Sequence, residues 1–109
     1  MKLFHLFDEI SYKKNEPVKN DLIVDSHYKL VTIGVETGVT ISPCIMQSEM
    51  VFYVVEGSGR IKANDVVKSL TPGDIVVVPA KASRSITADH RLSILAIQVH
   101  RSALDKMNK

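Results

Sequence analysis

The chain of 109 residues is long enough for one hydrophobic core and too short for two. Its apolar content of 45% and charged content of 24% are those of an ordinary soluble globular domain. A formal charge of +2, with the 14 Lys and Arg scattered along the chain, does not indicate a nucleic-acid surface. No run approaches the roughly 20 consecutive apolar residues of a membrane span. We therefore expect neither nucleic acid nor a membrane as a partner.

Cysteine usage indicates the compartment. Cys44 is the single cysteine, so an internal disulfide is excluded, as in proteins of a reducing environment. The N-terminus soon becomes charged and has no small-residue cleavage site, unlike a secretory signal peptide. We expect a cytoplasmic protein.

The first 25 residues mix apolar and polar stretches. Five apolar side chains near the N-terminus fit either a short strand or one or two helical turns: Leu3, Phe4, Leu6, Phe7 and Ile10. Residues 11–21 are polar and contain a proline, which is typical of a surface loop. Residues 22–24 follow as a short edge strand. Residues 1–25 are thus expected to form an N-terminal arm with edge strands.

From Tyr28 onward the pattern is that of β-strands. Residues 28–36 are rich in Val, Ile and Thr and predict a strand. Residues 39–41 begin another, and Pro43 then indicates an edge or a bulge because proline has no N–H to donate. Residues 51–55 and 75–78 are two further runs of Val and aromatic side chains.

Turn signals punctuate these runs. Besides the turn-prone Asp25-Ser26, we expect the chain to reverse at four places: Gly57-Ser58-Gly59, Asn64-Asp65, residues 71–74 and residues 89–91. The result is about eight to ten short strands and no long helix, a spacing typical of a β-sandwich or barrel. We predict one all-β domain over residues 1–109, with a barrel core at 28–100 and a polar tail at 101–109.

Two stretches resemble a known family. Residues 53–59, Tyr-Val-Val-Glu-Gly-Ser-Gly, and residues 72–79, Pro-Gly-Asp-Ile-Val-Val-Val-Pro, are similar to the two motifs of small single-domain cupins of the RmlC-like type. Gly38 fits the start of the first motif, and the resemblance covers roughly residues 30–100. It implies a double-stranded β-helix, a jelly-roll barrel with a cavity at one end.

The metal-ligand positions of that family are replaced in this chain. The resemblance places the usual two His, the Glu and the further His on Cys44, Met46, Met50 and Arg84. Imidazole and carboxylate suit divalent metals, whereas a guanidinium stays protonated and binds none. We therefore predict no metal and no other cofactor.

The sequence offers three other sources of metal ligands. Glu49 is next to the position of the motif Glu, but its side chain should face the other way unless a bulge intervenes. Cys44, Met46 and Met50 form a soft set that suits Cu(I), or they simply fill the cavity. The four histidines lie in different segments without ligand spacing: His5, His27, His90 and His100.

Alternation predicts what lines the cavity. Side chains two residues apart share a face of a strand, which gives the expected lining from the first motif region: Cys44, Met46, Ser48, Met50, Phe52 and Val54. Arg84 and Ile86 should face inward from the opposite sheet. Arg84 is the candidate to bind an anion, because a guanidinium pairs well with carboxylate or phosphate. The alternatives are a salt bridge to Glu49 or Asp89, or full exposure.

The resemblance and the replaced ligands favour a metal-free cupin that acts as a small-ligand-binding or structural module rather than an enzyme. One alternative is a cupin-type enzyme, isomerase-like or oxygenase-like, with a soft-metal site. Cys44 with Arg84 is the one candidate reactive pair. Another alternative is a sensing partner in transcriptional regulation, which would need a second chain to bind DNA.

We also expect a homodimer formed through the apolar N-terminal segment, since such a surface usually marks an interface. The alternative is that this segment folds over the barrel of its own chain.

Overall fold

The computed structural model describes residues 1–100, and the expected polar tail at 101–109 lies outside the described residues. The elements follow in the order 3₁₀ helix Leu6–Asp8, β1 Val18–Val24, β2 Tyr28–Val35, β3 Thr40–Ile45, β4 Glu49–Ala63, β5 Val66–Leu70, β6 Ile75–Val78 and β7 Ser83–Val99. No helix in this part of the chain is long and apolar enough to cross a membrane.

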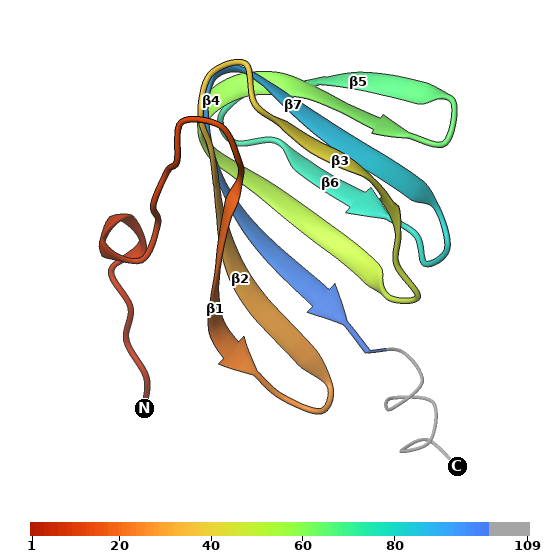
Figure 1. The fold of residues 1–109 in the computed structure, drawn as a ribbon. Helices are drawn as coiled ribbons and strands as arrows, with labels where there is room; N and C mark the ends of the chain where they lie inside the picture. Colours follow the sequence, from red (N-terminus) through yellow and green to blue (C-terminus); the bar gives the residue numbers. More distant parts are fainter. Residues whose placement is uncertain (101–109) are drawn as a thin grey trace.

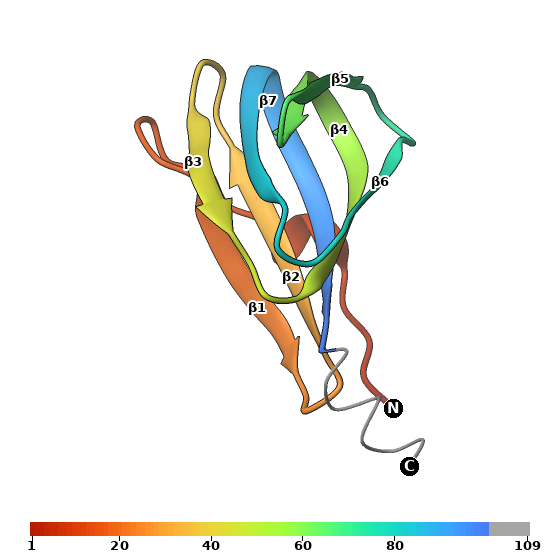
Figure 2. The ribbon, with the colours of Figure 1, turned by 90° about the vertical axis from the view of Figure 1, so that its right-hand side faces the viewer.

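Two long strands, β4 and β7, run antiparallel at the centre of one seven-stranded sheet, which folds over into two halves, called the first and the second sheet below (Figures 1 and 2). In the first sheet, residues 92–99 of β7 pair with β2 and with residues 49–54 of β4, while β1 and β6 complete the edges. In the second sheet, residues 83–87 of β7 pair with β3 and with residues 60–63 of β4, while β5 pairs with β4.

The passage from one sheet to the other is a shared bend. The register between β4 and β7 shifts three times between Val54 and Gly59, as at β-bulges, which bend and twist a strand. Glycine is required there because the backbones nearly touch. A Cβ on Gly57 would lie 1.9 Å from the Arg91 carbonyl oxygen, and one on Gly59 would lie 2.2 Å from that of Thr87.

Two of the four expected chain reversals are therefore wrong. Gly57-Ser58-Gly59 lies inside β4 and residues 89–91 lie inside β7, and these two segments face each other at the bend. Glycines and polar residues occur in sharp bends of a strand as well as in turns, so the composition of a segment does not distinguish a bend from a turn. Because the strands expected on either side of each bend form one continuous strand, residues 1–100 contain seven strands, fewer than the eight to ten expected. The turns at Asn64-Asp65 and at residues 71–74 are present.

The first strand is longer than predicted. β1 begins at Val18, so residues 18–21 are strand where a loop was expected. Their polar side chains suggested a loop, but β1 is an edge strand, and its long polar side chains reach water from either face.

The core lies between the two sheets. Within residues 1–100 it consists of 16 buried apolar residues, supplied by the inward faces of the strands and by two loop residues, Val39 and Ala82. Phe52, Val54 and Ile61 of β4 and Ile86 and Ile94 of β7 are each at most 2% exposed.

The N-terminal arm packs on the outside of the first sheet. The Thr32 hydroxyl donates to the Glu9 carbonyl at 2.7 Å, and the Tyr12 and Ser93 hydroxyls are hydrogen-bonded. A Cβ on Gly34 would lie 2.0 Å from the Ser11 carbonyl oxygen. Residues 9–12 thus cover the sheet of their own chain, which buries Thr32 and Ser93 completely.

Candidate functional site

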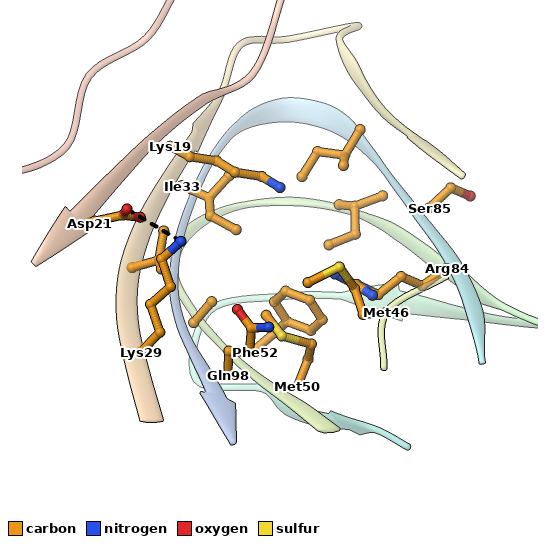
Figure 3. Close-up of a pocket in the computed structure, with 14 residues that line it drawn as sticks. Lys19, Asp21, Lys29, Ile33, Met46, Met50, Phe52, Arg84, Ser85 and Gln98 are labelled. Atoms are coloured by element: carbon orange, nitrogen blue, oxygen red, sulfur yellow. Dashed lines mark ion pairs between the residues drawn. The ribbon is translucent and has the colours of Figure 1, made fainter. Parts of the chain in front are cut away.

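A pocket of about 100 Å³ lies between the two sheets (Figure 3). Its walls are largely apolar, with side chains from β2, β3, β4 and β7. Its polar lining consists of Lys19, Asp21, Lys29, Arg84, Ser85 and Gln98. An apolar cavity with a few convergent polar groups is the usual form of a small-molecule site.

The register of the first sheet determines which of its side chains form one wall of the pocket. Val31 is opposite Ala96, and Ala96 is opposite Phe52, so these three side chains form one row on the inner face. Gln98 and Met50 are opposite each other in the next inward row. The alternation that buries Phe52 and Val31 therefore also directs the Gln98 amide into the pocket.

Arg84 comes from the second sheet. Residues 84, 86 and 88 of β7 are buried and residues 83, 85 and 87 are half-buried, so the arginine occupies an inward position. It is 7% exposed, and its guanidinium carbon lies 5.6 Å from the centroid of the Phe52 ring, a cation–π contact. The charge thus lies beside the aromatic wall of the pocket.

Within residues 1–100, the Arg84 side chain makes no hydrogen bond or ion pair, with Glu49, Asp89 or any other residue. Asp89 instead accepts from Arg60 at 3.1 Å. Among these residues no side-chain nitrogen or oxygen is sealed from open space without a partner. The Arg84 nitrogens therefore still contact open space, and a ligand in the pocket can reach them.

A second pocket, polar and of about 110 Å³, lies on the other side of Arg84. Lys62, Asn64, Ser83 and Ser85 contribute to it. Phe52 lines only the first pocket. Since the guanidinium lies over the Phe52 ring, we assign its charge to the first.

The rim of the first pocket carries further charges. The Lys29 ammonium pairs with the Asp21 carboxylate at 3.3 Å, and Lys19 extends from the same edge strand as Asp21 (Figure 3). Three cations and one carboxylate line the pocket, which leaves two positive charges unbalanced. An anion is the ligand that this charge distribution favours.

Five of the six residues proposed from the sequence as cavity-lining do line this pocket: Met46, Met50, Phe52, Arg84 and Ile86. Cys44 is not among the lining residues. It is half-buried in β3 and opposite Arg84 in the register, next to an irregularity between Ile41 and Cys44. Ser48 and Val54, which alternation placed on the same face, do not line it either.

Sequence reasoning missed the charged rim. Lys19 and Asp21 fell in the expected loop, and Lys29 and Gln98 in strands read only for their apolar residues. The signal was alternation: Lys29, Val31 and Ile33 share one face of β2, and Lys19 and Asp21 share one face of β1.

The donor set does not suit the divalent metal that the cupin resemblance implies. The lining provides the Met46 and Met50 thioethers and Asp21, whose carboxylate is engaged by Lys29. The four histidines, all within residues 1–100, lie away from the pocket. No group of three or more His, Cys, Asp or Glu in this part of the chain is placed to hold a metal ion. Two thioethers beside a guanidinium make a poor site for a hard or borderline ion.

Neither protein-family models nor curated proteins match this sequence. Solved structures do. An uncharacterised conserved protein with a double-stranded β-helix domain from Klebsiella pneumoniae superposes with a TM-score of 0.85 at 13% identity, covering 91% of this chain and 90% of that one. An RmlC-like cupin from Desulfovibrio desulfuricans gives 0.82 at 19% identity, covering 91% and 96%. A cupin superfamily protein from Desulfitobacterium hafniense gives 0.75 at 20%, covering 80% of each chain.

The protein therefore has the cupin fold, an all-β double-stranded β-helix, as the sequence predicted. At identities this low the likeness shows the fold alone. The chemistry has to be argued from the pocket of this chain.

Proposed function

We propose that this protein is a metal-free cupin-fold module that binds a small organic anion, with Arg84 as the residue that holds the anionic group. The observation that carries the proposal is the environment of Arg84. Its side chain is nine-tenths buried, lines an apolar pocket, and pairs with no acid within residues 1–100.

The free-energy cost of burying a charge is the reason why such an arginine favours an anionic ligand. Withdrawing an unpaired cation from water costs on the order of several kcal/mol unless a partner or hydrogen bonds compensate. The Phe52 ring offsets part of that cost. A carboxylate that accepts two parallel N–H bonds from the guanidinium would offset more, since bidentate charge-assisted bonds are among the strongest in proteins. The apolar walls would bind the carbon skeleton attached to it.

Binding of organic anions tests the proposal. We expect monocarboxylates such as hexanoate to raise the unfolding temperature of the wild-type protein and to give saturable binding by calorimetry. Arg84→Met should reduce that affinity by at least about tenfold, because it removes hydrogen bonds to a charged group. Arg84→Lys should recover only part of it, since an ammonium lacks the planar fork.

The matched control is Arg60→Met, which removes an exposed arginine paired with Asp89 outside the pocket and should leave affinity unchanged. Equal affinity in Arg84→Met and wild type, with both folded by circular dichroism, would show that Arg84 is not the anion site. Elemental analysis of the same preparations tests the metal-free part. A stoichiometric transition metal would contradict it and favour the alternative of a soft-metal enzyme.

A further inference from the structure

The pocket has a second cation that pairs with no acid in the part of the chain that the structure describes. Lys29 is paired with Asp21, but Lys19, on the same inward-facing side of β1 as Asp21, makes no ion pair or hydrogen bond within residues 1–100. From this pair of unbalanced cations we propose that the ligand is a small dicarboxylate, with one carboxylate on Arg84 and the other on Lys19. The inference rests on the proposed function and goes beyond it by naming the ligand class.

The position of Lys19 follows from the register. It is opposite Ile33, and Asp21 is opposite Val31, and both of these β2 residues are buried in the core. Directly opposed residues share a face of the sheet. Edge strands can carry charged side chains that point inward, and Lys19 is such a residue, since its side chain is directed to the pocket (Figure 3).

Lys19 and Arg84 come from opposite walls. Lys19 belongs to the edge of the first sheet and Arg84 to the second sheet, and apolar side chains such as Ile33 and Phe52 lie on the walls between. A ligand that touches both cations must pass over this apolar surface. Two acidic groups joined by a short hydrocarbon chain meet that requirement, because both charges are paired and the methylenes stay out of water.

Phosphate fits the site less well than carboxylate. Phosphate sites in proteins commonly use several backbone N–H groups at a helix N-terminus or in a glycine-rich loop. The one helix within residues 1–100 has three residues and lies in the N-terminal arm, and the pocket has no glycine in its lining. A single guanidinium fork matches one carboxylate in both shape and charge.

The test compares ligands that differ by one charge. Calorimetric titrations with the dicarboxylates from malonate to adipate are paired with the monocarboxylates of equal chain length, propanoate to hexanoate. We expect the best dicarboxylate to bind about three to ten times more tightly than its monocarboxylate, the range for an added partly exposed ion pair. The preference should shrink as salt is added, because exposed charges are screened.

Lys19→Gln is the deciding variant. It should remove the preference for dicarboxylate while leaving monocarboxylate affinity within about twofold of wild type. Lys68→Gln is the matched control, since it removes one lysine from exposed strand β5 outside the pocket. It should keep the preference intact.

The outcomes separate the two proposals. Monocarboxylate binding that depends on Arg84, without tighter binding of any dicarboxylate or without an effect of Lys19→Gln, overturns the dicarboxylate inference and leaves the anion site standing. Absence of binding by every carboxylate overturns both. Tight dicarboxylate binding that persists in Arg84→Met would also contradict both, because it would place the ligand elsewhere.

Discussion

At the residue scale, Arg84 shows how a replaced position acquires a different chemistry. The cupin resemblance puts it where a metal-binding histidine is usual, yet it is buried at the pocket wall and pairs with no acid within residues 1–100. An arginine here presents a fixed positive charge to the pocket, where a histidine would present a nitrogen able to bind a metal. Met46 and Met50 complete the change, because their thioethers present apolar surface to the same pocket.

A second arginine has a different role. Arg91 donates to Glu36 at 2.7 Å and lies over the Tyr12 ring at 4.5 Å, so it ties the N-terminal arm to the barrel. The hydrogen bond from Arg91, followed by that from the Thr37 N–H, holds the pKa of Glu36 below its usual value of 4.5. A carboxyl with a depressed folded-state pKa contributes stability above its unfolded pKa and loses it as the pH falls through the folded pKa.

We therefore predict that Glu36→Gln lowers the urea midpoint near neutral pH, and that this difference from wild type disappears once the pH is below the folded pKa of Glu36. Urea titrations of both proteins over a series of pH values measure it. Glu16→Gln, which removes one side of an exposed pair with Lys13, is the control and should change little. A difference that stays constant down to acidic pH would mean that the Glu36 charge is not responsible.

At the scale of the elements, the shared bend of β4 and β7 is what gives the barrel its two sheets. Gly57 has φ +86° and no room for a Cβ, whereas Gly38 has a similar φ of +81° with open space around it. Substitutions at the two glycines therefore distinguish the cost of a left-handed backbone, present at both, from the cost of a steric clash, present only at Gly57.

We predict that Gly38→Ala costs about 1–2 kcal/mol for the left-handed backbone alone. Gly57→Ala should cost about 2 kcal/mol more than that, because the new methyl group collides with the Arg91 carbonyl and the bend has to open. Chemical denaturation of both variants measures the difference. Equal losses in the two variants would show that the close approach at Gly57 relaxes without penalty.

The strands illustrate what the sequence predicts and what it does not. Apolar runs rich in β-branched residues, such as β2 and β6, were found from composition, whether largely buried as in β2 or half exposed as in β6. β1 was read only in part because an edge strand needs few apolar residues. The bends at Gly57 and His90 were predicted as turns. What distinguishes a bend from a turn here is the pairing of β4 with β7, and that pairing joins residues distant in sequence.

The same limit applies to the site. Met46, Met50, Phe52, Arg84 and Ile86 were predicted because they follow the strand alternation that the cupin motifs indicate. Lys19 joins them only through the pairing of β1 with β2. No local sequence pattern predicts that pairing, so the position of the second cation at the pocket could be found only from the three-dimensional structure.

At the scale of the whole molecule, the apolar surface raises the question of assembly. Leu3, Phe4 and Phe7 of the N-terminal segment are 93%, 38% and 49% exposed, and Ile75 and Val77 on the outward side of β6 are 66% and 57% exposed. Residues 9–12 pack on their own barrel, but the residues before them leave much of their apolar surface in water. Exposed apolar clusters commonly mark interfaces.

We predict that the protein is a homodimer held by this N-terminal segment. Light scattering after gel filtration should give twice the 12.1 kDa of the chain. The double substitution Phe4→Ser, Phe7→Ser should shift the mass to that of a monomer. Ile75→Thr, Val77→Thr tests the other exposed surface and should leave the dimer intact. Dissociation by the β6 pair instead would place the interface on the sheet, and a monomeric wild type would exclude the dimer.

The bent strands β4 and β7 also determine how cooperatively the molecule unfolds. β4 and β7 supply the centre of both sheets, so neither sheet retains its middle once the pairing between these two strands is lost. Their partners are distant along the chain, as in Met50 with Gln98, so forming this pairing closes large loops. Unfolding should accordingly be all-or-none, and amide hydrogens in the two sheets should exchange with solvent through one common opening rather than sheet by sheet.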